Sequence, residues 1–218
     1  TAERHPEWLE VSEDGRINGT PPYEPGFYRK LLVHSEYYAF LKQHVTEILE
    51  TFDVDGFFFD IVQPYNDSSP LSKQMMLEQG LDPADPAQRR DFGLKVLNDF
   101  KVDFTKFIRK TSKDCTIFYN SGHVGPRHRP VAEAYSHWEL ESLPSGGWGY
   151  LHFPTTIRYA RNLGLDSLGM TGKFHTSWGD FHSFKNQPAL EFECFQMLAL
   201  GASGSVGDQL HPSGRICP

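Results

Sequence analysis

Segments with helical spacing of apolar residues alternate along the chain with short, continuous apolar runs. Apolar side chains recur every three to four positions in segments that we predict to be helical, at residues 35–52, 91–110, 155–162 and 189–200. Shorter apolar runs bounded by turn residues predict strands at residues 55–62, 116–120, 133–141, 168–172 and 203–207. A short helix is expected near 71–79, and Ser35 is a suitable N-cap for the first long helix. Residues 1–33 and 174–185 are expected to be mainly loop.

Strands that alternate with helices favour right-handed βαβ units and a parallel sheet. The run at 55–62 contains three consecutive phenylalanines and is typical of a strand buried on both faces. Polar side chains repeatedly follow the predicted strands: Asp60, Asn120, Glu139, Glu141, Thr171, Lys173 and Asp208. A (β/α)8 barrel explains this regularity, because all of its strand ends meet on one face.

The length of the chain modifies this prediction. An eight-stranded barrel usually needs about 250 residues, whereas the chain has 218 residues, begins at Thr1 and contains five predicted strands. We therefore expect an α/β fold in which residues 1–218 form a single, N-terminally truncated TIM-barrel domain that covers about strands 4–8.

Composition narrows the possible partners. With 39% hydrophobic and 22% charged residues the chain is ordinary for a globular protein, and a net charge of -7 without a basic patch argues against nucleic acid. No apolar run is long enough to cross a bilayer, and we expect no membrane partner. The three cysteines lack the spacing of a disulfide framework or a zinc site. The expected truncation leaves localisation open, with the cytoplasm favoured.

Three segments carry a resemblance to glycoside hydrolases of the α-L-fucosidase kind. Asp-Gly-Phe-Phe-Phe-Asp at 55–60 resembles the strand-four motif whose last Asp is the nucleophile of that family. Trp-Glu-Leu-Glu at 138–141, followed by Trp-Gly-Tyr at 148–150, is similar to the segment that holds its acid/base Glu. The stretches 171–180 and 207–212 resemble a fucosidase-related bacterial family whose barrel precedes a β-galactosidase-type trimerisation domain. The resemblance implies a carbohydrate substrate, no cofactor, and a full-length protein that forms a homo-oligomer.

Glycoside hydrolysis with retention of configuration requires two carboxyl groups about 5–5.5 Å apart. By resemblance Asp60 is the expected nucleophile, while Glu139 and Glu141 compete for the acid/base role. These two alternate along one strand and therefore share a face. The spacing to Trp148 favours Glu139, whereas a position nearer the strand end favours Glu141. We assign the role to Glu139, with Glu141 as the alternative, and expect the glutamate without this role to pair with Arg158 or Arg161.

Further residues at the rim of the expected barrel are candidates for binding sugar hydroxyls. They are His34, Tyr37, Asn120, His123, His152, His175, Trp178, Asp180, Asp208 and His211. Trp178, which precedes a glycine, is the best aromatic platform for an apolar sugar face such as a 6-deoxy methyl group.

Three alternatives stay open at this point. A β-galactosidase or another exo-glycosidase fits the same carboxylates. A metal-dependent deacetylase or amidohydrolase barrel could use His175, Asp180 and His182, or His123 and Asp208, although no His-Glu-x-x-His motif is present. An inactive sugar-binding barrel is disfavoured by the presence of both carboxylates.

Overall fold

The computed structural model describes residues 1–26 and 29–216, so that Cys217 lies outside the described residues. The chain divides into two compact units, of which unit 1 comprises Thr1–Asp55 and Val62–Cys115, and unit 2 comprises Gly56–Ile61 and Thr116–Pro218. The phenylalanine-rich strand thus belongs to unit 2, while the segments on either side of it belong to unit 1. The single barrel domain expected for residues 1–218 stays a prediction.

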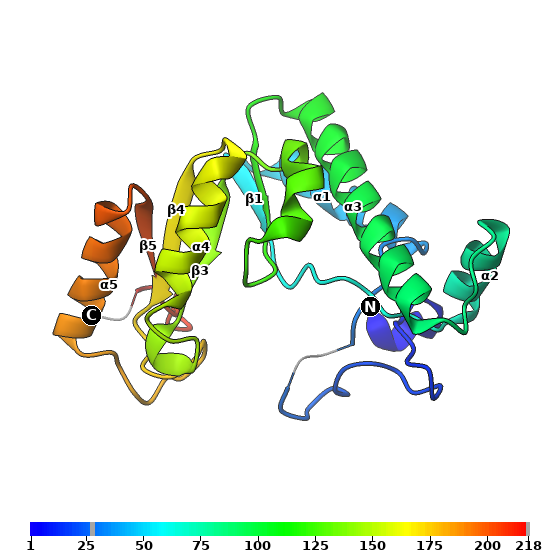
Figure 1. Ribbon diagram of the computed structural model, residues 1–218, viewed down its shortest axis with the longest axis horizontal. Helices are drawn as coiled ribbons and strands as arrows, with labels where there is room; N and C mark the ends of the chain where they lie inside the picture. The colour runs from blue at the N-terminus through cyan, green and yellow to red at the C-terminus, as the bar shows by residue number, and fades with distance from the viewer. Residues whose placement is uncertain (27–28, 217–218) are drawn as a thin grey trace. The chain divides into compact units, whose positions relative to one another are not determined.

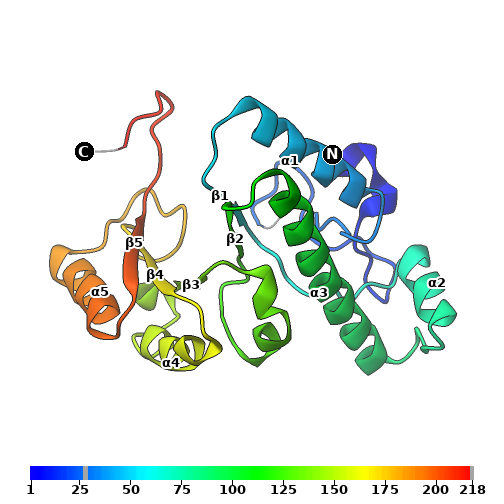
Figure 2. The same ribbon diagram turned by 90° about the horizontal axis from the view of Figure 1, so that it is seen from above.

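Unit 1 is built on three helices, α1 (Tyr37–Thr51), α2 (Pro70–Glu78) and α3 (Pro86–Thr111), which follow the short 3₁₀ turns η1 (Ala2–Arg4) and η2 (Pro6–Trp8). Figures 1 and 2 show α1 beside α3, and the ring of Tyr38 on α1 lies 5.7 Å from that of Phe100 on α3. Helix α3 starts five residues earlier than predicted, because Asp85 caps it and Pro86 occupies its first position, where proline is tolerated. Ser35 does not start α1 as its cap residue, although its hydroxyl accepts a hydrogen bond from the Tyr37 N–H.

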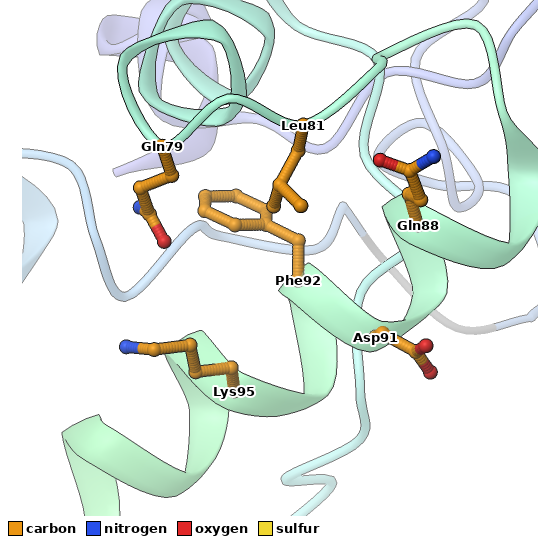
Figure 3. A pocket seen from close by; sticks show the side chains of 6 residues that line it. All are labelled: Gln79, Leu81, Gln88, Asp91, Phe92 and Lys95. Atoms are coloured by element: carbon orange, nitrogen blue, oxygen red, sulfur yellow. The ribbon is translucent and has the colours of Figure 1, made fainter.

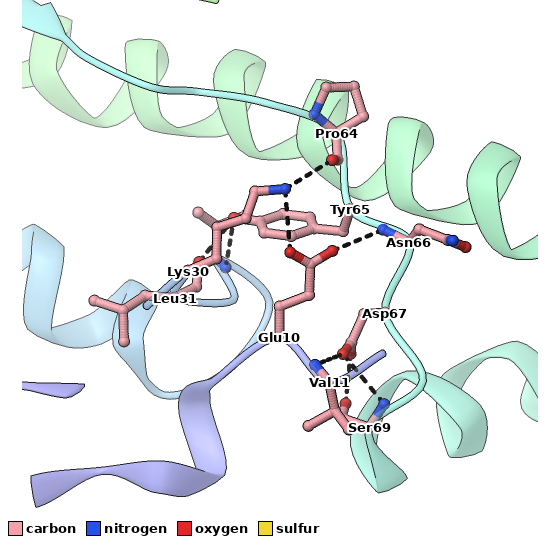
Figure 4. A network of polar contacts seen from close by, with 10 residues as sticks. Glu10, Val11, Lys30, Leu31, Pro64, Tyr65, Asn66, Asp67 and Ser69 are labelled. Carbon is pink, nitrogen blue, oxygen red and sulfur yellow. Dashed lines mark hydrogen bonds and ion pairs between the residues drawn. The ribbon is translucent and has the colours of Figure 1, made fainter. Parts of the chain in front are cut away.

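The irregular N-terminal loop of unit 1 is ordered by a partly buried polar network centred on Glu10 (Figure 4). The carboxylate of Glu10 accepts a hydrogen bond from the Asn66 N–H at 2.8 Å and pairs with the Lys30 ammonium at 3.1 Å. Lys30 also donates to the Pro64 carbonyl and lies 5.1 Å from the centre of the Tyr65 ring. The loop is therefore tied to residues 64–66 by matched charges and donors rather than by regular secondary structure.

The described part of unit 2 contains five strands in two parallel sheets, and within each sheet the strands neighbour one another in chain order. Strand β1 (Gly56–Phe59) pairs with β2 (Thr116–Tyr119), and β3 (Trp138–Glu141), β4 (Ser167–Gly172) and β5 (Ser203–Gly207) form a second sheet in that order. The two sheets meet where the Ser136 N–H donates to the carbonyl of Ile117 at 3.0 Å. Within residues 1–26 and 29–216 the sheets are small and do not close into a barrel.

Helices α4 (His152–Ala160) and α5 (Gln187–Ala199) lie along β3, β4 and β5 (Figures 1 and 2). Gly169 in β4 allows this packing, since a Cβ added there would lie 2.5 Å from Met197 of α5 and 2.9 Å from Phe153 of α4. Trp138 and Leu140, both almost fully buried, add to the core of the unit. Short 3₁₀ turns complete the unit: η3 (Pro126–Ala134), η4 (Pro144–Gly146) and η5 (Arg161–Leu163).

Two expectations from the sequence are wrong in detail. The strand predicted at 133–141 begins only at Trp138, because residues 126–134 form η3, in which Pro126 and Pro130 favour tight helical turns. Strand β1 is not buried on both faces, since 45% of the surface of Phe58 is exposed to solvent. Among the described residues, none of the helices has the length and apolar character needed to span a membrane.

Candidate active site

Four of the predicted site residues form a continuous chain of hydrogen bonds in unit 2. Nδ2 of Asn120, the residue after β2, donates to Asp60 Oδ1 at 2.9 Å and to Glu141 Oε2 at 2.8 Å. The other carboxylate oxygen of Glu141 accepts a hydrogen bond from Trp178 Nε1 at 2.7 Å. Residues contributed by the ends of β1, β2 and β3 and by the loop after β4 thus converge on one place.

The orientation of the Asn120 amide is determined by its surroundings. Its Oδ1 accepts a hydrogen bond from the Gly122 N–H at 2.9 Å, so that Nδ2 is directed to the two carboxylates. The backbone N–H of Asn120 donates to the carbonyl of Phe59 at 2.7 Å, which holds the residue beside the end of β1. Because Asn120 is buried, both halves of its amide need partners, and both have them.

The shared amide limits the distance between Asp60 and Glu141. The two acceptor oxygens can be no further apart than the combined length of their hydrogen bonds to Asn120 Nδ2, which are 2.9 and 2.8 Å. Because the two N–H bonds of an amide diverge by about 120°, the oxygens lie roughly 5 Å apart. Glu141 is buried and Asp60 is exposed, so that one carboxylate is shielded and the other is accessible.

The backbone directly after Asp60 is strained. Ile61 has φ 55°, in the left-handed region that β-branched residues rarely adopt. Such conformations cost about 1–3 kcal/mol and cluster at functional sites. This feature had no signal in the sequence, since nothing about an isoleucine predicts positive φ.

Glu139, the residue favoured by resemblance as the acid/base, has a different environment from Glu141. Its carboxylate lies 2.8 Å from Nε2 of His137, two positions earlier in the chain. Among the described residues neither Glu139 nor Glu141 forms the expected ion pair with Arg158 or Arg161, and Arg158 donates to the carbonyl of Pro154 instead. Register along β3 therefore brings Glu141, not Glu139, into hydrogen-bonding contact with Asn120.

Two predicted histidines form a pair close to this chain of hydrogen bonds. The rings of His123 and His152 have centroids 5.6 Å apart, and His152 Nδ1 lies 3.3 Å from the hydroxyl of Ser142, the residue after Glu141. Burial lowers the pKa of both imidazoles; the Arg127 charge adds to the effect at His123, and His123 does so at His152. Both rings are therefore mainly neutral at pH 7 and can accept or donate hydrogen bonds.

The loop at 173–185 contains two further predicted residues, which serve the loop itself. Asp180 accepts hydrogen bonds from the hydroxyls of Ser183 and Thr176, which lower the pKa of its carboxyl to about 2. The backbone carbonyl of His175 accepts a hydrogen bond from the Ser145 hydroxyl. The contacts that the structure gives for these residues are thus within the loop or to η4.

At the end of β5, Asp208 pairs with Lys173, and the hydrogen bond from Lys173 lowers the pKa of its carboxyl. His211 is exposed, and its Nδ1 lies 2.9 Å from the Ser213 hydroxyl. Neither residue belongs to the chain of hydrogen bonds around Asn120.

His34 and Tyr37, also predicted to bind substrate, belong to unit 1. His34 Nε2 lies 2.8 Å from the Ser72 hydroxyl, and its ring packs edge-on to Tyr65 and Phe92. Burial lowers the pKa of His34 and raises that of Tyr37.

A separate pocket of about 310 Å³ lies in unit 1 (Figure 3). It contains none of the predicted site residues and is lined by Gln79, Leu81, Gln88, Asp91, Phe92 and Lys95. Within residues 1–26 and 29–216, no group of three His, Cys, Asp or Glu side chains is arranged to hold a metal ion. The metal-dependent alternative therefore has no ligand cluster in the described part of the chain.

One protein-family model and two distantly related solved structures match the chain. Residues 1–61 match a protein-family model described as "Hypothetical glycosyl hydrolase 6". Two solved structures of bee venom hyaluronidase, one of them with a hyaluronic acid tetramer, align at TM-scores of 0.50 and 0.55. They are 14% and 13% identical, cover 74% and 91% of this chain and 66% and 73% of theirs, and bear on the fold alone. No curated protein matches the chain.

A further solved structure is much more similar to the chain. α-L-Fucosidase isoenzyme 2 from Paenibacillus thiaminolyticus aligns with 99% of the chain at a TM-score of 0.92 and 36% identity. The chain spans about a third of the length of that protein, 33%. The resemblance to α-L-fucosidase-like glycoside hydrolases is thereby confirmed, and the findings support a glycoside hydrolase with a fucosidase-like α/β structure.

Proposed function

We propose that the protein hydrolyses terminal α-L-fucosyl residues with retention of configuration, using Asp60 as nucleophile and Glu141 as acid/base. The observation that carries this proposal is the amide of Asn120, which donates to both carboxylates at 2.9 and 2.8 Å. The resulting separation of roughly 5 Å agrees with the about 5–5.5 Å typical of retaining enzymes, and is shorter than the about 6.5–9.5 Å of inverting ones.

In the proposed first step, Glu141 gives its proton to the glycosidic oxygen while an oxygen of Asp60 bonds to the anomeric carbon. The bond between that carbon and the leaving oxygen breaks, and a fucosyl ester of Asp60 forms. In the second step, Glu141 takes a proton from water as the water oxygen attacks the same carbon, which releases fucose and restores the Asp60 carboxylate. The exposed position of Asp60 suits attack on a bound sugar.

Glu141 is chosen over Glu139 because of their partners. Asn120 links Glu141 to Asp60, whereas Glu139 pairs with His137. The choice of Glu139 from the spacing to Trp148 is a prediction that only variants can test. The choice of fucose depends on similarity to the Paenibacillus fucosidase.

We further propose that β1 to β5 correspond to strands 4–8 of a (β/α)8 barrel. The parallel pairing of β1 with β2, and of β3, β4 and β5 in chain order, supports this arrangement together with the polar residues at the strand ends. In such a barrel Asp60, Asn120 and Glu141 would all lie at the C-terminal mouth.

The test is a panel of nitrophenyl glycosides assayed with the purified protein, followed by proton NMR of the first sugar released. The proposal expects hydrolysis of the α-L-fucoside with α-L-fucose as the initial product. A preference for the β-galactoside would support the runner-up substrate, and initial release of β-L-fucose would contradict retention. Azide rescue of Glu141→Ala, but not of Glu139→Ala, on an activated fucoside would identify the acid/base.

A further inference from the structure

The loop between β4 and α5 brings an indole N–H to one of the two proposed catalytic carboxylates. Trp178 Nε1 donates to Glu141 Oε1 at 2.7 Å, while Asn120 donates to Oε2 of the same group at 2.8 Å. Indole N–H is only a donor, so that this contact fixes which atoms face each other. Both oxygens of Glu141 are thus held, one from each side.

The ring of Trp178 lies where two strands end in glycine. A Cβ added to Gly207 would lie 2.2 Å from Trp178 Cζ3 and 2.4 Å from Cη2, which no side chain tolerates. A Cβ added to Gly172 would lie 3.0 Å from Cζ3. Neither glycine has a positive φ, so backbone conformation does not require glycine at these positions. Glycine is instead explained by the space that the indole ring occupies. The two residues form a seat for the indole.

The loop that carries Trp178 is anchored at both ends. At its start, the Lys173 N–H donates to the Gly207 carbonyl at 3.0 Å, and the Lys173 side chain pairs with Asp208. At its end, the ammonium of Lys185 is buried between the Thr171 hydroxyl and the carboxylate of Glu193 on α5. The Lys185 N–H donates to the carbonyl of Lys173 at 2.8 Å, which joins the two ends.

Inside the loop, the ring of Trp178 is held from the side. Phe174, which is buried, meets it edge-on at a centroid distance of 5.8 Å. Asp180 closes the turn around it through the hydroxyls of Thr176 and Ser183. A side chain so restrained loses little entropy when it keeps its hydrogen bond, and it can therefore orient a partner effectively.

We propose that Trp178 is a positioning residue that orients the Glu141 carboxylate, that Gly207 is required to leave space for its indole ring, and that Gly172 completes this seat. This inference rests on the proposed function of Glu141. It differs from the role expected from the sequence, in which Trp178 is a platform for the apolar face of the sugar. A positioning role changes turnover and its pH dependence, whereas a platform role changes substrate binding.

Kinetics on an aryl α-L-fucoside separate the two roles. Trp178→Phe keeps a ring in the seat and removes the N–H, so we expect kcat to fall roughly tenfold or more with KM nearly unchanged. The high-pH limb of the kcat/KM profile should also move, because one donor to the acid/base is lost. A raised KM with unchanged kcat and pH profile would overturn the proposal in favour of the platform.

The glycine seat has a matched control on the same strand. Gly207→Ala drives a Cβ into the indole and is expected to reproduce the loss of kcat seen in Trp178→Phe. Gly204→Ala adds the same methyl group where the nearest atom, Met197 Sδ, lies 3.7 Å away, an ordinary contact. It should retain the turnover of the unmodified protein. Equal effects of both substitutions would contradict a specific seat, and Trp178→Phe decides the matter if Gly207→Ala does not fold.

A measurement without turnover distinguishes failure of this inference from failure of the proposed function. In ¹⁵N-labelled protein, the indole N–H signal of Trp178, assigned with Trp178→Phe, is expected to shift in Glu141→Gln and to stay in place in Glu139→Gln. An indole N–H chemical shift that is unchanged in Glu141→Gln would contradict the contact between Trp178 and Glu141. Protein that shows the expected shift but hydrolyses no fucoside would refute the proposed substrate and leave the positioning contact standing.

Discussion

Two hydrogen-bond networks in this molecule each surround a different buried glutamate. They differ in whether a cation compensates the charge of its carboxylate. In unit 1, Glu10 faces the Lys30 ammonium at 3.1 Å and accepts the Asn66 N–H (Figure 4). In unit 2, Glu141 accepts hydrogen bonds from the neutral side chains of Asn120 and Trp178. Among the described residues neither Glu141 nor Asp60 forms an ion pair, whereas Glu10 is matched by a cation.

The difference fits a structural role for Glu10 and the proposed catalytic role of Glu141. A buried carboxylate is costly unless it is paired or well hydrogen-bonded, and a cation is the direct compensation. The Glu10 network uses that compensation and ties two segments of unit 1 together. The Glu141 site holds two carboxyl groups without a cation. Such an arrangement is less stabilising than an ion pair and is typical of functional sites. Substitutions in unit 1 should therefore alter stability, and those around Glu141 should alter turnover.

The largest effect is expected at the two proposed catalytic carboxylates. Asp60→Asn and Glu141→Gln should each lower kcat/KM for an aryl α-L-fucoside by roughly 10³-fold or more, because the nucleophile or the proton donor is lost. The urea midpoint of Asp60→Asn should stay close to that of the unmodified protein. Glu139→Gln is the matched control and should lose far less activity. Normal turnover by Asp60→Asn would reject it as nucleophile.

The next effect concerns stability in unit 1. Glu10→Gln leaves the ammonium of Lys30, whose side chain is 30% exposed, without its carboxylate, and should cost about 1–3 kcal/mol in the free energy of unfolding. Turnover per folded molecule should not change. Adding Lys30→Met to Glu10→Gln should recover part of the loss, as measured in a double-mutant cycle by urea unfolding. A loss of turnover without a loss of stability would remove the contrast between the two networks.

A smaller effect is expected when the bridge between the carboxylates is removed. Asn120→Ala deletes the donor shared by Asp60 and Glu141 and should lower kcat roughly 10- to 100-fold, since both groups stay but lose their fixed separation. Ser121→Ala, a truncation of the adjacent buried residue, is the comparison variant. The measurement is kcat of both variants on the same fucoside. Equal activity of Asn120→Ala and Ser121→Ala would show that the Asn120 amide is dispensable.

The smallest effect is the pH dependence contributed by His34. Burial lowers its pKa in the folded state, so that between the unfolded value of about 6.5 and the lower folded value the unfolded chain binds more protons. The stabilisation is complete above about pH 6.5 and declines as the pH falls toward the folded pKa. Urea midpoints between pH 7.5 and 5 should fall less in His34→Gln than in the unmodified protein. An identical slope would exclude this contribution.

Local periodicity predicted most of the elements but not their limits. The helical spacing of Phe92, Leu97 and Phe104 identifies α3, and the apolar run at 57–59 identifies β1. Residues 126–134 were not recognisable as η3, because Val131 and Ala134 in a 3₁₀ turn are as apolar as strand residues. A long single helix is favoured by many repeated contacts, whereas a short turn is decided by its neighbours.

The residues of the candidate site are recognisable in the sequence, but their arrangement is not. The sequence predicts Asp60, Asn120 and Glu141 at strand ends and Trp178 in the loop at the rim of the barrel. Contact with Asn120, on which we base the proposal of Glu141 over Glu139, is a matter of tertiary register rather than of local pattern. The strained backbone at Ile61 was equally invisible, because its positive φ is imposed by the surrounding structure.

The most direct test of the central claim is to trap the covalent intermediate. An activated, fluorinated fucosyl glycoside slows both chemical steps, and a good leaving group allows the ester to accumulate. Proteolysis and mass spectrometry of the treated protein should then find one fluorinated fucosyl group on the peptide that contains Asp60, and none in Asp60→Asn. An adduct on Glu139 or Glu141 instead, with Asp60 unmodified, would contradict the account.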